Sequence, residues 1–210
     1  MFILLLGGPG SGKSSVSAGL KSRVTKELTE KVFFIAEAFS SLYGHMPEEY
    51  RSKLMKKDKD TSFLRQFLIS STQISMVTLL RSKELYHSRI IFADRSLYDA
   101  SIYEEELSGK IYGCFEPESL EISVPDIVLL FKLPERAPHS SEGDLTYRIE
   151  SDYSEAKQLE EKTIRYWEKA VGPEKIVQIP VFDTIDSKVQ YTADLLNQYF
   201  GKQVFDVGPV

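Results

Sequence analysis

The residues with the clearest chemical meaning lie near the N-terminus, where residues 7–14 read GGPGSGKS. They form a G-x-x-x-x-G-K-S motif between an apolar run at residues 2–6 and a helix-like segment that starts near Lys13. Glycines permit the left-handed backbone that turns consecutive amides inward, and a helix N-terminus adds free amides and a positive dipole end. The spacing therefore predicts a loop that wraps the phosphates of a nucleoside triphosphate.

The motif also assigns roles to single residues. Lys13 is expected to reach the terminal phosphates, and the Ser14 hydroxyl is expected to be a ligand of Mg²⁺. ATP is preferred to GTP because Asn197 is the only asparagine, so that no N-K-x-D guanine-reading motif exists. The predicted phosphate contacts are Gly8, Pro9, Gly10, Ser11, Gly12, Lys13, Ser14 and Ser15.

Charged residues follow two further apolar runs, at residues 32–36 and 90–93. Ligands of doubly wound sheets bind beyond the carboxyl ends of the strands, so these residues are candidates for the same site. We expect Asp94 to bind or support Mg²⁺, and Glu37 to act as general base on an acceptor hydroxyl. Arg95 is expected to hold the acceptor or the transferring phosphate by a forked contact. In the simpler alternative, Asp94 caps a helix and Glu37 is a surface carboxylate.

Two other segments carry candidate substrate contacts. Residues 134–151 are polar, contain two prolines and a glycine, and predict a lid whose Arg148, or less favourably Arg136, closes over the phosphates and excludes water. Gln66 and Gln73 are seven residues apart and lie on one helix face, where they are candidates for binding the acceptor. The alternatives are solvated arginines and exposed or capping amides.

The elements that must position these residues alternate along the chain. Near-continuous apolar runs at residues 2–6, 32–36, 90–93, 127–131 and 176–179 are typical of strands buried on both faces of a parallel sheet. Helical patterns fill residues 13–29, 38–88, 96–122, 152–171 and about 184–200. This alternation predicts one α/β domain over residues 1–210, with helices on both sides of a doubly wound five-stranded sheet. Residues 38–88 are long enough for two helices and form the predicted acceptor-binding region.

Composition narrows the function classes. The chain has 210 residues, is 42% hydrophobic and carries a net charge of −5, which argues against a general nucleic-acid binder. The single cysteine, Cys114, allows no internal disulfide and fits a reducing, cytoplasmic compartment. No apolar stretch approaches the roughly 20 residues of a membrane span, and the three histidines lack metal-ligand spacing. The oligomeric state is left open, a homodimer included.

The run Asp94-Arg95-Ser96-Leu97-Tyr98-Asp99 resembles the Glu/Asp-Arg-Ser element of the deoxynucleoside kinases, and FLRQ at residues 63–66 is similar to their F-x-x-Q stretch. Nearly the whole chain resembles the P-loop ATPase/kinase group that includes ribosylnicotinamide kinase domains, and thymidylate kinases share the Asp-Arg pair. The resemblance implies a P-loop NTPase fold with strand order 2-3-1-4-5 and ATP-dependent phosphorylation of a small, nucleoside-like acceptor. Ala38 and Leu42 stand where deoxynucleoside kinases usually have proline and tryptophan, so the acceptor itself stays open.

Two other functions remain as alternatives to a kinase. A nucleotide-dependent switch or adaptor would bind a phosphoinositide or a protein partner, using the basic residues Arg51, Lys53, Lys56, Lys57 and Lys59. A motor-type ATPase would need a glutamate after the strand-end aspartate, and this chain has Arg95 there. An arginine at that position favours a kinase that binds an acceptor.

Overall fold

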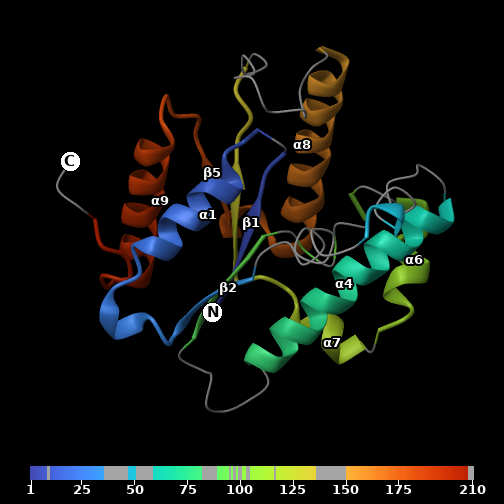
Figure 1. Ribbon diagram of the computed structural model, residues 1–210, viewed down its shortest axis with the longest axis horizontal. Helices are drawn as coiled ribbons and strands as arrows, with labels where there is room; N and C mark the ends of the chain where they lie inside the picture. The colour runs from blue at the N-terminus through green and yellow to red at the C-terminus, as the bar shows by residue number, and fades with distance from the viewer. Residues whose placement is uncertain are drawn as a thin grey trace.

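The computed structural model describes residues 1–8, 10–35, 47–50, 59–81, 89–94, 96, 98, 101–102, 105–115, 117–135 and 150–207. Its centre is a five-stranded parallel sheet in the order β2-β3-β1-β4-β5 (Figure 1). The strands are β1 (Phe2–Leu6), β2 (Val32–Ile35), β3 (Ile90–Asp94), β4 (Ile127–Phe131) and β5 (Ile176–Ile179). The predicted strand order and all five predicted strands are confirmed, with Asp94 included as the last residue of β3.

Helices cover both faces of this sheet (Figure 1). Helices α1 (Lys13–Ser22) and α9 (Ile185–Phe200) pack on one face, where alternate β1 residues such as Ile3 and Leu5 point. Helices α4 (Lys59–Arg81) and α8 (Glu150–Val171) pack on the other face, and its core includes Trp167 of α8. Every residue of β1, β3 and β4 is consequently buried, which explains why these strands read as unbroken apolar runs.

Two predicted helices are shorter than their sequence patterns. The helix predicted over residues 13–29 ends at Ser22, and the 3₁₀ helix η1 (Lys26–Leu28) follows it. Between them Val24 forms an antiparallel bridge with Phe205, which draws the chain out of the helix. The helix predicted over residues 96–122 is divided into α6 (Glu105–Tyr112) and α7 (Pro117–Ile122), both of which contact α4. Gly113 and the proline that opens α7 separate them.

The C-terminal helix α9 has a capping residue at each end. It follows the 3₁₀ helix η4 (Pro173–Lys175) and β5, and its cap Thr184 accepts a hydrogen bond of 3.1 Å from the Ser187 amide. Gly201 ends it in the left-handed conformation.

None of the described helices is long and apolar enough to cross a membrane.

Gly19 sets the distance between α1 and α9, because a Cβ atom there would lie 2.6 Å from Cγ2 of the buried Val189. In Gly19→Ala we expect overpacking to cost about 1–3 kcal/mol. Alanine stabilises a helix by roughly 1 kcal/mol relative to glycine, so we expect the net free energy of unfolding to fall. Gly109→Ala in α6 is the matched control, since a Cβ there meets nothing within 4 Å. Thermal unfolding should show a lower Tm for the first variant and an equal or higher Tm for the second. Equal stabilisation by both would contradict this view of the helix pair.

Candidate functional site

The G-x-x-x-x-G-K-S loop connects β1 to α1, and two of its glycines have the left-handed backbone conformation that favours glycine. Gly10 and Gly12 have φ angles of 79° and 78°, which other residues adopt only with strain. Gly12 is the residue before α1, and no described side chain caps the helix there. The N-terminal amides of α1 therefore face the loop without competition from a side chain, as an anion site at a helix N-terminus requires.

The start of the loop lies tightly against β4. A Cβ atom at Gly7 would lie 2.5 Å from the Ser11 hydroxyl oxygen and 2.9 Å from the Phe131 carbonyl oxygen. A Cβ at Gly8 would lie 3.1 Å from Cδ1 of Leu133, just beyond the same strand. The glycines thus allow the loop to fold back on itself and onto the end of β4. The Ser11 amide closes this turn with a hydrogen bond of 3.1 Å to the Gly8 carbonyl oxygen.

Asp94 links the loop to the neighbouring strand. The β1–β3 register pairs Asp94 with Leu5, so its carboxylate lies next to the place where the loop begins. Lys13 Nζ forms an ion pair with Asp94 Oδ1, and Ser14 Oγ donates a hydrogen bond of 3.3 Å to Oδ2. Asp94 is only 7% exposed. The structure therefore brings together the three residues that the sequence assigned to the terminal phosphate and the metal.

The chemistry of this group fits Mg²⁺ and a triphosphate. Hydroxyl and carboxylate oxygens are the ligands that Mg²⁺ prefers, and Ser14 and Asp94 already present both kinds within hydrogen-bond distance. Lys13 is a cation at the mouth of the loop, where phosphate oxygens would be a second partner for its ammonium group. These contacts would hold Asp94 and Lys13 in place before any ligand arrives.

Helix α4 carries both predicted glutamines and brings Gln73 to the end of β3. Gln73 Nε2 donates a hydrogen bond of 3.3 Å to the backbone oxygen of Asp94. Gln66 and Gln73 are 7% and 3% exposed, so the alternative of exposed amides does not hold. Gln66 Oε1 is buried and has no hydrogen-bond partner among the described residues, which leaves this oxygen available as an acceptor.

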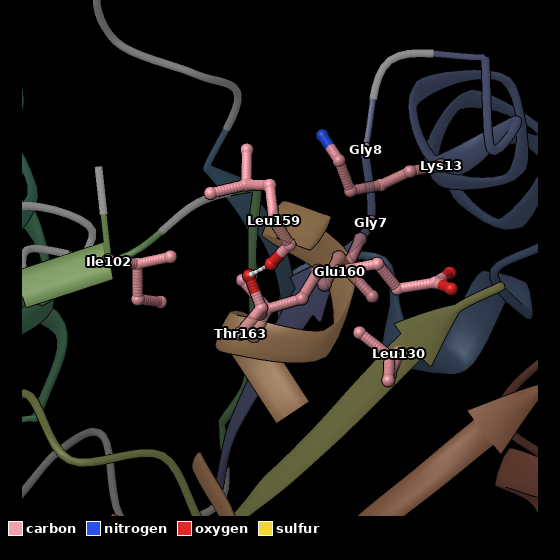
Figure 2. A pocket seen from close by; sticks show the side chains of 10 residues that line it. Gly7, Gly8, Lys13, Ile102, Leu130, Leu159, Glu160 and Thr163 are labelled. Atoms are coloured by element: carbon pink, nitrogen blue, oxygen red, sulfur yellow. Dashed lines mark hydrogen bonds between the residues drawn. The ribbon is translucent and has the colours of Figure 1, made fainter. Parts of the chain in front are cut away.

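A small pocket opens beside the loop (Figure 2). Gly7, Gly8 and Lys13 border it on one side, and Leu159, Glu160 and Thr163 of α8 face them. Leu5, Leu6, Ile102 and Leu130 complete an apolar lining. The pocket therefore lies between the side of the loop that carries Lys13 and α8, the helix that follows the predicted lid.

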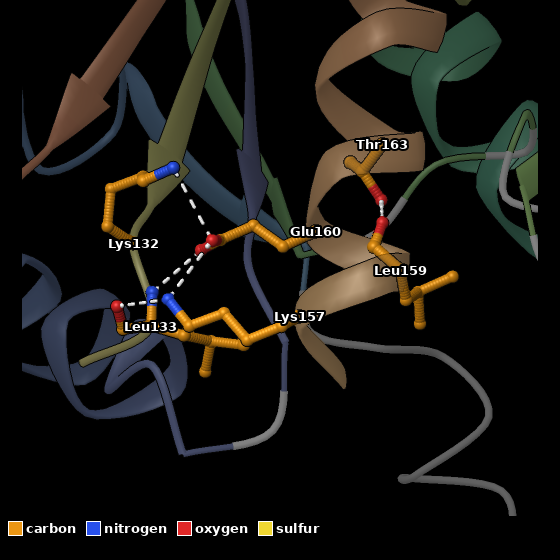
Figure 3. A network of polar contacts seen from close by, with 6 residues as sticks. All are labelled: Lys132, Leu133, Lys157, Leu159, Glu160 and Thr163. Atoms are coloured by element: carbon orange, nitrogen blue, oxygen red, sulfur yellow. Dashed lines mark hydrogen bonds and ion pairs between the residues drawn. The ribbon is translucent and has the colours of Figure 1, made fainter. Parts of the chain in front are cut away.

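A buried carboxylate joins α8 to the end of β4 (Figure 3). Glu160 accepts a hydrogen bond of 2.7 Å from the Leu133 amide and lies 3.4 Å from the ammonium groups of Lys132 and Lys157. Lys157 Nζ donates in turn to the Leu133 carbonyl oxygen at 2.9 Å. Since Leu133 also packs against Gly8, this network supports the phosphate loop from the side of α8.

Several predicted site residues lie outside the described residues. They are Pro9, Glu37, Arg95, Arg136 and Arg148, together with Arg51, Lys53, Lys56 and Lys57 of the basic cluster. Lys59 begins α4, and Ser15 is exposed on α1. Ser96 follows β3, and its hydroxyl accepts a hydrogen bond of 3.0 Å from the Tyr98 amide, as a turn residue does.

Two buried charged residues beside the loop, Glu160 and Lys188, were not predicted from the sequence. Lys188 of α9 is 5% exposed, and its Nζ donates a hydrogen bond of 2.8 Å to the Ser11 carbonyl oxygen. Both residues stand on the apolar stripe of their helix, Glu160 between Ala156 and Thr163, and Lys188 beside Val189. A single charge within such a stripe is the signal that could have identified them.

No protein-family model and no protein of curated function matches the chain. Among solved structures it is similar to the thymidylate kinase from Ehrlichia chaffeensis, with a TM-score of 0.58 and 16% identity, over 94% of this chain and 98% of that chain. It is also similar to the thymidylate kinase from Candida albicans, with a TM-score of 0.60 and 16% identity, over 95% and 92% of the two chains. The chain has the P-loop NTPase α/β fold.

The network around Glu160 generates a stability prediction. We expect Glu160→Ala to lower the free energy of unfolding by about 1–3 kcal/mol, because the buried Leu133 amide loses its acceptor. Glu161→Ala removes a neighbouring carboxylate whose pair with Arg165 is exposed, and it should change the value by less than about 1 kcal/mol. Urea unfolding of the two variants provides the measurement. If Glu160→Ala lowers the free energy of unfolding no more than Glu161→Ala does, the network does not stabilise the junction of β4 and α8.

Proposed function

We propose that this protein is a P-loop kinase that transfers the terminal phosphate of ATP to a hydroxyl or phosphate group of a small nucleoside-like acceptor. The observation that supports the proposal most strongly is the contact of Lys13 and Ser14 with the buried carboxylate of Asp94. A glycine-rich loop alone would bind phosphate. An aspartate at the end of the neighbouring strand that contacts both side chains also fixes the lysine and the hydroxyl that phosphoryl transfer uses.

The donor side of the site consists of the loop amides, Lys13 and Ser14. The amides orient the phosphates, and Lys13 places a positive charge where negative charge accumulates during transfer. Mg²⁺, when held by Ser14 with Asp94, would neutralise further phosphate charge. Asp94 would keep the lysine and the hydroxyl at fixed positions, so that neither has to be ordered during the reaction.

The acceptor side would be formed by β2, β3 and α4. Strands β2 and β3 are neighbours and pair Ile35 with Ala93, so Glu37 and Arg95 follow adjacent strand ends in the sequence. We assign Glu37 the role of taking a proton from the acceptor, and Arg95 the role of holding the acceptor in place. The buried amide of Gln66 would bind a polar edge of a base, and the thymidylate kinases of the same fold support an acceptor of the nucleoside or nucleotide class.

Water must be kept from the phosphate during transfer, and we assign this role to residues 134–151 with Arg148. The segment joins the end of β4 to α8, both of which border the phosphate loop. Its closure would place an arginine over the terminal phosphate and separate it from solvent.

The transferase activity can be tested with radiolabelled ATP and a panel of nucleosides, nucleoside monophosphates and ribosylnicotinamide. We expect the parent protein to label at least one acceptor in the presence of Mg²⁺. Lys13→Ala should abolish this labelling because the terminal phosphate loses its cation. Binding of MgATP by the parent without labelling of any acceptor would contradict a kinase and leave a nucleotide-binding protein.

Glu37 is tested separately with Glu37→Gln, which keeps the size of the side chain and removes its basicity. For the acceptor found in the panel, we expect kcat to fall by about 10²–10⁴-fold while the affinity for ATP stays close to that of the parent. Steady-state kinetics and ATP titration give the two values. A variant as active as the parent would remove Glu37 from the role of general base.

A further inference from the structure

The phosphate loop has a buried cation behind it, on the side of α9. Lys188 enters from the start of α9, which lies beside α1 (Figure 1), and its Nζ donates to the Ser11 carbonyl oxygen at 2.8 Å. A Cβ atom at Gly12 would lie 3.6 Å from the same Nζ and 3.0 Å from Ile185 Cδ1. The first turn of α9 therefore contacts the loop at the peptide that joins Ser11 to Gly12.

This cation has no counter-ion within the part of the chain that the structure describes. None of the ion pairs among the described residues includes Lys188, and burial alone lowers the pKa of its ammonium group. Asp186 belongs to the same helix but is exposed, and residues two positions apart do not face each other on a helix. A buried charge without a counter-ion is costly, which raises the question of which anion compensates it.

The geometry of the peptide group supplies the connection to the ligand. In a planar trans peptide the carbonyl oxygen and the following N–H point in opposite directions. Because Lys188 reaches the Ser11 oxygen from the side of α9, the Gly12 N–H is directed away from α9. A charged donor on the carbonyl oxygen also polarises the peptide and strengthens the N–H as a donor.

We propose that Lys188 is a positioning residue for polyphosphate binding, which orients the Gly12 amide and adds a further positive charge to the phosphate site from the side of α9. This inference rests on the proposed binding of a nucleoside triphosphate. Lys13 acts at the mouth of the loop, whereas Lys188 acts through the backbone and through its charge. The phosphates supply the anion that the buried ammonium group lacks in the protein itself.

The test is calorimetric titration of Lys188→Met with MgATP, MgADP and magnesium pyrophosphate. Methionine keeps the length and shape of the side chain but removes the charge and the donor. We expect the Kd of all three ligands to rise by about 10- to 100-fold, the usual effect of losing a hydrogen bond to a charged group. Pyrophosphate is included because it has no base, so its weaker binding locates the effect at the phosphates.

Two further variants serve as controls. Lys202→Met makes the same change in net charge at an exposed position after α9 and should leave each Kd within about twofold of the parent. Lys188→Gln keeps a neutral donor, and we expect its Kd to lie between those of the parent and Lys188→Met. It also replaces Lys188→Met as the test variant if that protein does not fold.

The possible outcomes separate this inference from the proposed function. If the parent binds none of the three ligands, the proposed function and this inference both fail. If the parent binds MgATP and both Lys188 variants bind it within about twofold as tightly, the proposed function stands and the role of Lys188 is wrong. A reduced number of binding sites with an unchanged Kd would indicate damage to the fold and would likewise overturn the positioning role.

Discussion

The contact between Asp94 and the phosphate loop depends on one constraint, which is that parallel strands place all their carboxyl ends at the same edge of the sheet. The loop leaves this edge from β1, and Asp94 ends β3 immediately beside it. Ser14 and Asp94, which are 80 positions apart in the chain, therefore meet at this edge. The roles proposed for Lys13, Ser14, Glu37 and Arg95 all depend on this shared edge.

The strands and the helices α8 and α9 could be predicted almost residue by residue, whereas the helix ends within residues 13–29 and 96–122 could not. A strand buried on both faces needs an unbroken apolar run, and the runs here, at four or five residues, are too short for a typical helix. A helical pattern continues in sequence beyond the point where tertiary contacts end the helix, as at Ser22, where the bridge of Val24 to Phe205 redirects the chain. That bridge involves a residue from the far end of the chain, so no local pattern could show it.

Within the site, the sequence identified side chains whose neighbours are fixed by a motif. Lys13 and Ser14 belong to a spacing that has one structural meaning, and Asp94 ends a strand, so their meeting could be expected. Glu160 and Lys188 are defined instead by what packs around them, namely the Leu133 amide and the Ser11 carbonyl oxygen. Their sequence signal is a charge on an apolar helix face, and it does not indicate which partner compensates the charge.

A glycine-rich loop gains close access to phosphates but loses rigidity, because glycine has the greatest backbone freedom in the unfolded chain. Here the missing side chains are replaced by supports from three directions. Asp94 holds the mouth of the loop, Leu133 with Glu160 lies under its start, and Lys188 fixes its middle. All three of these supports bury a charge, which a purely structural contact would avoid since apolar packing stabilises a fold at lower cost. Charged supports make physical sense if the loop must keep its amides aimed at an anion, because they orient peptide groups in a way that apolar side chains cannot.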